Sequence, residues 1–241
     1  MPLTTRTRVL GCPVDVVDMG TAVERLLELL ASAGGQPALV VTLNPEILMR
    51  ARREPSFGAL LESAALIVPD GVGLVRALRR RGFRRAERVG GADLLEAYLP
   101  HARSLGHRVA LVGAGPGVAE RAAEVLRRRH PGLDVVADGG DPTAATAARV
   151  GATEPAVVAA AYGAGRQERF LRDHLEGMHG HVGIGVGGTL DYLAGTARRA
   201  PALVRQAGLE WLWRLAHEPS RWRRQLALPR FWFLERREAR R

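Results

Sequence analysis

The sequence contains no lysine and a single cysteine. The 35 basic residues among its 241 are therefore all arginines. The absence of lysine excludes a P-loop lysine and any mechanism through a Schiff base. The single cysteine, Cys12, excludes an internal disulfide, fits a reducing compartment and argues against a cysteine-based metal cluster.

Long hydrophobic runs are also absent. No stretch of about 18 uninterrupted apolar residues occurs, so we expect no transmembrane helix and only peripheral contact with any membrane. The polar residues 1–8 do not resemble a signal peptide. The contents of 46% hydrophobic and 25% charged residues exclude disordered, collagen-like and disulfide-scaffold proteins. The length suits one large α/β domain or two small ones.

Positive charge and tryptophan are concentrated at the C-terminal end. The chain carries a net charge of +10, and residues 198–241, with 12 arginines and four glutamates, hold +8 of it. All four tryptophans lie in the same segment: Trp211, Trp213, Trp222 and Trp232. A basic, aromatic segment of this kind indicates a nucleic acid, an anionic membrane surface or a phosphate-bearing substrate as partner.

Short apolar runs alternate with longer segments of helical periodicity. This alternation predicts an α/β fold with a Rossmann-like, mostly parallel sheet flanked by helices. We expect strands at residues 38–43, 65–68, 108–112, 134–137, 156–160 and 182–186. We expect helices at residues 21–32, 72–81, 92–105, 116–129 and 167–176. After a core of residues 1–197, we predict a helical C-terminal appendage, 198–241, with helices at 201–217, 220–228 and 229–241.

Ligands of open parallel sheets bind beyond the carboxyl ends of the strands. The loop at residues 113–117 resembles a dinucleotide fingerprint, but Val118 replaces the third glycine. Two interpretations stay open for this loop. It is either a phosphate-facing turn at a helix N-terminus or a tight turn with Pro116 as the first helical residue.

Other polar side chains at predicted strand ends also have two interpretations. Asp70 either displays its carboxylate at the rim of a cleft or caps the following helix. Thr42 and Asn44 are ligand-binding residues or turn and cap residues, and Asp191 equally fits the first turn of a helix. The seven histidines are scattered without a ligand set, so we expect no structural metal.

Several motifs occur together in one order along the chain. They are residues 42–46 (TLNPE), 55–57 (PSF), 69–73 (PDGVG), 88–94 (RVGGADL), 167–168 (QE), 185–195 (GVGGTLDYLAG), 199–201 (RAP), 208–215 (GLEWLWRL) and 218–221 (EPSR). Together they resemble the WecG/TagA/CpsF glycosyltransferases, glycosyltransferase family 26, from about residue 9 to residue 224.

The resemblance implies an inverting glycosyltransferase. Its donor would be a UDP-sugar carrying a hexose or an N-acetylhexosamine of the N-acetylmannosamine type. Its acceptor would be a polyprenyl-diphosphate-linked sugar in cell-surface polysaccharide or teichoic acid synthesis. The resemblance further implies a protein held peripherally at the cytoplasmic face of the cell membrane, an appendage that closes over the site, and no metal or other cofactor.

The resemblance also implies roles for particular residues. Asp70 matches the proposed catalytic base. The substrate-binding residues that we predict are Thr42, Asn44, Arg88, Gln167, Gly187 and Asp191. The appendage arginines implied to bind the acceptor diphosphate are Arg214, Arg221 and Arg224. Two departures stand out: Gly165 and Arg166 replace the usual Pro-Lys, so we expect a looser loop there, and residues 139–142 (GGDP) replace a Gly-Tyr-Phe pattern.

The appendage itself has two interpretations. Its aromatic residues Trp222, Phe231, Trp232 and Phe233 could seat at a lipid headgroup boundary. Alternatively it is a basic amphipathic helix docked on the core with its tryptophans buried, including Trp211 packed with Leu215.

Two other functions stay possible from the residues alone. One is a basic nucleic-acid-binding protein. The other is an NAD-dependent oxidoreductase with Asp134 or Asp138 as its ribose-binding acid. We favour the glycosyltransferase, without a nucleic-acid partner, and consider a homo-oligomer possible.

Overall fold

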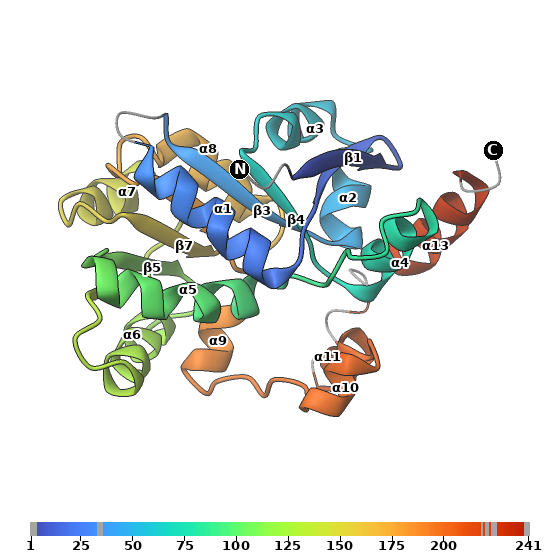
Figure 1. The fold of residues 1–241 in the computed structure, drawn as a ribbon. Helices are drawn as coiled ribbons and strands as arrows, with labels where there is room; N and C mark the ends of the chain where they lie inside the picture. The colour runs from blue at the N-terminus through green and yellow to red at the C-terminus, as the bar shows by residue number, and fades with distance from the viewer. Residues whose placement is uncertain (1–3, 33–35, 218, 220–221, 223–225, 239–241) are drawn as a thin grey trace.

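The computed structural model describes residues 4–32, 36–217, 219, 222 and 226–238. Its centre is a six-stranded parallel sheet with the strand order β4-β3-β8-β7-β5-β6 (Figure 1). The strands are β3 (Ala38–Leu43), β4 (Leu66–Pro69), β5 (Val109–Gly113), β6 (Val135–Asp138), β7 (Val157–Ala161) and β8 (Val182–Gly185). These are the six strands predicted from the sequence, displaced by at most a residue or so at either end.

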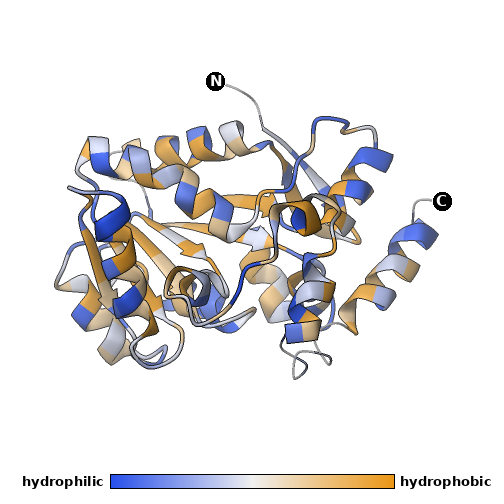
Figure 2. Ribbon diagram, turned by 90° about the horizontal axis from the view of Figure 1, so that it is seen from below, coloured by the Kyte–Doolittle hydropathy of each residue, from blue (hydrophilic) through white to orange (hydrophobic). Residues whose placement is uncertain are grey.

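Helices cover both faces of this sheet, which explains why its strands are largely apolar. Side chains alternate between two hydrophobic cores: Val109 and Leu111 of β5 enter one core, and Ala110 and Val112 the other. The first core includes α1 (Met19–Ala31), α5 (Gly91–Leu105), α6 (Val118–Arg129) and α9 (Thr189–Leu193). The second includes α2 (Pro45–Ala51), α3 (Pro55–Glu62), α4 (Val72–Arg80), α7 (Ala144–Gly151) and α8 (Arg166–His174). Figure 2 shows the hydrophobic strands enclosed by these amphipathic helices.

An antiparallel hairpin precedes the sheet and was not predicted. It pairs β1 (Thr5–Val9) with β2 (Cys12–Val16). Its buried Asp15 accepts hydrogen bonds from Arg6 at 2.8 Å and from the backbone N–H of Ile67, in β4, at 2.7 Å. The hairpin therefore attaches to the edge strand of the sheet through a carboxylate.

Two helix predictions were wrong in their bounds. Helix α6 begins at Val118 after Gly117, so Pro116 lies in the preceding turn and is not the first helical residue. The segment predicted as one helix at 201–217 forms two, α10 (Ala202–Gln206) and α11 (Glu210–His217). Gly208 separates them with a φ of +74°, a conformation that favours glycine and ends a helix. Most of the helix predicted at 220–228 lies outside the described residues.

The last helix, α13 (Ala227–Glu238), packs beside α4 and α2 (Figure 1). The Phe231 ring is fully buried against Gly73 of α4. Glu235, also fully buried, is ion-paired with both Arg80 and Arg81. These contacts fix α13 to α4, and the division into residues 1–197 and 198–241 stays a prediction.

Phe231→Ala tests this attachment. Removing a buried phenyl ring is expected to weaken the docking of α13 by about 3–5 kcal/mol. Hydrogen exchange should show lost amide protection in α13 and unchanged protection in the sheet. Phe233→Ala is the matched control, because the Phe233 ring on the same helix is 66% exposed, and it should change protection by less than about 0.5 kcal/mol. Wild-type protection in Phe231→Ala would contradict the packing.

Candidate active site

A cavity of about 770 Å³ lies where the strand ends of β3 and β4 face the C-terminal helices. Four of the predicted site residues line it: Asn44, Asp70, Arg88 and Arg214. Its apolar wall includes Leu209, Trp211, Leu215 and Trp232 from α11, α13 and the segment before α11. The cavity therefore combines charged side chains near the strand ends, Asp70 and Arg88, with an aromatic wall from the C-terminal helices.

Asp70 follows β4 directly. Its backbone N–H donates to the Leu43 carbonyl at 2.7 Å, which holds it beside the end of β3. The residue that precedes α4 is Gly71, and no side chain caps this helix, so the interpretation of Asp70 as a helix cap was wrong. Its carboxylate, 23% exposed, instead accepts a hydrogen bond from Arg88 Nε at 3.1 Å.

Arg88 contacts three carboxylates with its three guanidinium nitrogens. Nε donates to Asp70, Nη1 lies 3.3 Å from Asp93, and Nη2 lies 2.9 Å from Glu210 of α11. Gly90 leaves room for this cluster, because a Cβ there would come within 2.8 Å of Arg88 Nη2 and 3.2 Å of the Asp70 carboxylate. The glycine of the 88–94 motif thus serves close packing of charged groups.

The surroundings of Asp70 change its proton affinity. Burial raises the pKa of Asp70 to about 6, and the negative charges of Glu210 and Asp93 add to this rise, while Arg88 and Arg214 oppose it. Loss of hydration disfavours the charged carboxylate more than the arginines favour it. Asp70 is therefore a stronger base than an ordinary aspartate and is still mostly ionised near pH 7.

Four other predicted residues lie beside the cavity, not in its lining. The Thr42 hydroxyl donates to the Gly185 carbonyl at 3.0 Å, so its interpretation as a turn or cap residue was wrong. The Gln167 side-chain oxygen accepts a hydrogen bond from the Gly187 N–H at 3.1 Å. Asp191 lies in the first turn of α9, as the helical interpretation predicted. Asn44, in the lining, also caps α2 by accepting from the Ile47 N–H at 3.0 Å.

Arg214 lines the cavity and also contacts the segment that contains Gly187 and Asp191. A Cβ on Gly188 would come within 2.7 Å of Arg214 Nη2, so the glycine admits the guanidinium. The same guanidinium lies over the Tyr192 ring, 5.4 Å from its centroid. Arg221 and Arg224, the other two predicted diphosphate-binding arginines, lie outside the described residues.

The loop before α8 forms hydrogen bonds with α2 and with the first turn of α8. The Gly165 N–H donates to the buried Glu168 carboxylate at 2.5 Å, and Arg50 Nη1 donates to the Ala164 carbonyl at 2.6 Å. Gln167 also donates to Glu168, at 2.8 Å. These bonds join the loop to α2 and α8, and the looser loop that Gly165 and Arg166 lead us to expect in place of Pro-Lys stays a prediction.

The loop at residues 113–117 lies away from the cavity lining. The Tyr162 ring packs so closely on Gly113 that a Cβ there would come within 2.5 Å of it. The neighbouring loop at 139–142 is fixed by hydrogen bonds from the Gly140 N–H to Asp138 at 2.8 Å and from the Tyr162 hydroxyl to the Gly140 carbonyl at 2.9 Å.

Within the described ranges, no three His, Cys, Asp or Glu side chains gather so that they could hold a metal ion.

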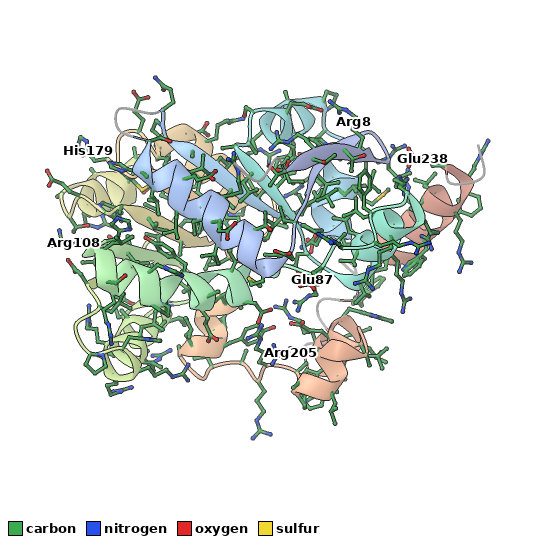
Figure 3. The ribbon with its side chains drawn as sticks, viewed as in Figure 1. Arg8, Glu87, Arg108, His179, Arg205 and Glu238 are labelled. Atoms are coloured by element: carbon green, nitrogen blue, oxygen red, sulfur yellow. The ribbon has the colours of Figure 1, made fainter. Side chains whose placement is uncertain are left out.

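Sequence reasoning did not assign roles to the partners of Arg88. Asp93 accepts from Arg199 at 2.5 Å and from Arg205 at 3.4 Å, and both arginines follow the last strand. Figure 3 shows Arg205 where α10 faces the rest of the molecule. Asp93 and Glu210 stand inside the quoted motifs, so the motifs were the available signal, but their spacing along the chain does not indicate that they meet.

The C-terminal helices also carry most of the exposed large hydrophobic side chains. Among the described residues these are Leu203, Leu209, Trp211, Leu212, Trp222, Leu226 and Phe233, and the one outside the helical end is Leu105. Trp211 is 40% exposed, so the interpretation of a docked helix with its tryptophans buried was wrong for this residue. No helix within the described part of the chain is both long and apolar enough to cross a bilayer.

The ionisation of Asp70 predicts a stability effect with a definite sign. With its pKa raised to about 6, the folded protein binds this proton more tightly than the unfolded chain, so stability falls as the pH rises from about 4 to about 6. Asp70→Asn cannot ionise and should raise the free energy of unfolding at pH 8 by about 1–3 kcal/mol. Urea unfolding should show this gain vanish near pH 4.

Asp138→Asn is the control of opposite sign. The bidentate hydrogen bonds from Arg149 to Asp138 lower the pKa of that carboxyl, so its stabilising effect is present at neutral pH and is lost in acid. This variant should lower the free energy of unfolding at pH 8. Destabilisation at pH 8 by Asp70→Asn as well would contradict the electrostatic account of the site.

Comparison with known proteins identifies the family of this chain. A sequence model of the family described as "Glycosyl transferase WecG/TagA/CpsF family" matches residues 7–241. A relative from Bacillus spizizenii strain W23 is 34% identical over 197 residues, which cover 80% of this chain and 77% of the relative. That relative is named N-acetylglucosaminyldiphosphoundecaprenol N-acetyl-beta-D-mannosaminyltransferase. With nearly its whole length matched, this chain belongs to the WecG/TagA/CpsF family of glycosyltransferases.

Proposed function

We propose that the protein transfers an N-acetylmannosaminyl group from a UDP-sugar to N-acetylglucosaminyl-diphosphoundecaprenol. The similarity to the Bacillus spizizenii enzyme supports both the sugar and the acceptor. The observation that carries the proposal is the composition of one cavity: a proton-accepting carboxylate, Asp70, shares it with Arg88 and Arg214 and with an apolar, aromatic wall. These are the groups that a sugar hydroxyl, a diphosphate and a lipid chain require.

In the proposed reaction, an acceptor hydroxyl attacks the anomeric carbon of the donor on the face opposite UDP. A new bond forms between this carbon and the hydroxyl oxygen as the bond to the UDP oxygen breaks, so the configuration inverts. The proton of the hydroxyl passes to the Asp70 carboxylate. General-base assistance of this kind contributes typically about 10²–10⁴-fold to the rate, and a base with a raised pKa is better matched to operation near neutral pH.

Arginines would stabilise the charge on the two diphosphates. UDP gains negative charge as it leaves, and fixed cations in a partly dehydrated cavity stabilise that charge better than water does. Arg88 and Arg214 are our candidates from the described residues, and Arg221 and Arg224 are the candidates that the family resemblance implies. We also propose substrate binding by Thr42, Asn44, Gln167, Gly187 and Asp191, which lie at or after the ends of β3, β7 and β8.

The lipid part of the acceptor accounts for the apolar surfaces. We assign the 198–241 segment to binding of the acceptor and of an anionic membrane surface at the cytoplasmic face. Its exposed leucine, tryptophan and phenylalanine side chains stand among arginines, a combination that binds the headgroup region of anionic lipids.

Asp70→Asn tests the proposed base. Transfer from UDP-N-acetylmannosamine to a short-chain lipid-diphosphate N-acetylglucosamine, followed by mass spectrometry, should slow by about 10²–10⁴-fold. Donor binding should persist, because asparagine has the same shape and Arg88 keeps its contacts with Asp93 and Glu210.

Asp134→Asn serves as the control, because Asp134 pairs with Arg108 just before β5 and β6 begin, at the opposite end of the sheet. It should transfer at the wild-type rate. Near wild-type turnover of folded Asp70→Asn would exclude Asp70 as the base.

The membrane surface makes a separate prediction. The double variant Leu203→Ser, Leu212→Ser removes two exposed leucines that do not line the cavity. Its affinity for vesicles containing phosphatidylglycerol should fall at least about ten-fold in a flotation assay, because apolar area that would enter the headgroup region is lost. Leu105→Ser is the matched control, since Leu105 is exposed far from these helices and should not matter. Equal flotation of all three proteins would argue against this surface.

A further inference from the structure

Glu210 is a charged residue of the cavity that comes from the C-terminal helices. It is the first residue of α11, lines the cavity and lies 2.9 Å from Arg88 Nη2. Its side chain is only 19% exposed. No other ion pair of Glu210 is found within the described chain, whereas Asp93 is shared among Arg88, Arg199 and Arg205. The charge of Glu210 is therefore directed at Arg88.

The guanidinium of Arg88 is planar and offers its donors in fixed directions. Each of its three nitrogens is engaged by a different carboxylate: Asp70 after β4, Asp93 in α5 and Glu210 in α11. Two of these anchors belong to the body of the protein, and the third arrives with the C-terminal helices. Removing the third anchor leaves Nη2 without its carboxylate, so the guanidinium is held by Asp70 and Asp93 alone.

We infer that Glu210 is a positioning residue that orients Arg88 and thereby couples the docking of α11 to the reactivity of Asp70. The inference rests on the proposed role of Asp70 as the base. It adds that the C-terminal segment does more than cover the site, because it delivers a carboxylate that completes the charge arrangement around the base.

The charged groups that face Asp70 support the direction of this coupling. They are Arg88, Glu210, Asp93 and Arg214. Glu210 brings negative charge towards Asp70 and, with the rest of the C-terminal helices, removes water from it, and both effects raise the pKa of Asp70. With α11 undocked, Asp70 would return towards the weak basicity of a hydrated aspartate. A base that strengthens only in the closed site limits reaction of the donor with water.

The test compares Glu210→Gln with Glu238→Gln. Glutamine keeps the shape of Glu210 and removes its charge. Glu238 is the matched control, because it also lies in the C-terminal segment and pairs with Arg81, but does not line the cavity. The midpoint of Asp70 is followed by carboxyl ¹³C NMR of the substrate-free protein, with Asp70→Asn identifying the resonance, and the pH profile of kcat/KM is measured in parallel.

Glu210→Gln should lower the titration midpoint of Asp70 and shift the acidic limb of the pH profile to lower pH by the same amount. At its plateau, kcat should fall about ten- to hundred-fold, since a hydrogen bond between charged groups that fixes Arg88 is lost. Glu238→Gln should leave the midpoint, the profile and kcat at their wild-type values. A wild-type midpoint in Glu210→Gln, or an equal change in both variants, would overturn the inference.

Glu210→Asp tests the geometry separately and serves if Glu210→Gln does not fold. It keeps the charge but is one methylene shorter, so it should lose contact with Nη2 and lower kcat with little effect on donor KM. Wild-type kcat in this variant would overturn the positioning role. The NMR titration needs no substrate, so the two proposals can fail separately. A shifted Asp70 midpoint in a protein without transferase activity would refute the proposed function and leave the electrostatic effect of Glu210 on Asp70 intact.

Discussion

One arginine holds the candidate active site together. The guanidinium of Arg88 is the meeting point of carboxylates from the end of β4, from α5 and from α11, which belong to separate parts of the chain. A partly buried carboxylate without such a partner would be protonated or would face outwards. The cluster therefore decides where Asp70 stands, how strongly it holds its proton and where the C-terminal helices must dock.

The C-terminal helices that line the cavity are attached to the rest of the protein and also expose apolar side chains. Its last helix, α13, is fixed to α4 by the Phe231 ring and by the buried ion pairs of Glu235. Around this anchor, leucine, tryptophan and phenylalanine side chains remain open to solvent. A segment with this composition can stay bound to its own protein while offering apolar area to a lipid surface, which suits an enzyme whose acceptor is proposed to reside in a membrane.

The sequence predicted the sheet well, because strands covered on both faces must be apolar and such runs are visible without any partner information. It did not predict the β1–β2 hairpin. The arginines and threonines at positions 5–8 and Asp15 leave these two short strands with too few apolar residues for a recognisable strand pattern. Asp70 was found from its place after a strand and from its motif. The link from Asp70 through Arg88 to Glu210 was not found, because contact between distant segments follows from tertiary packing. Gly208, tolerated in a helical pattern, ends a helix here.

The contact between α13 and the turn of the β1–β2 hairpin has a consequence for the order in which the protein assembles. Glu238 of α13, labelled in Figure 3, accepts a hydrogen bond from the backbone N–H of Leu10, in the turn of the hairpin, at 3.0 Å. The ribosome makes Leu10 long before Glu238, and domains form largely in the order of synthesis. The sheet can thus assemble before α11 and α13 are made, whereas the aromatic wall can close only after these two helices have left the ribosome. A chain that terminates before α11 would keep the strands of the sheet and lack the wall that we propose encloses the lipid-linked sugar.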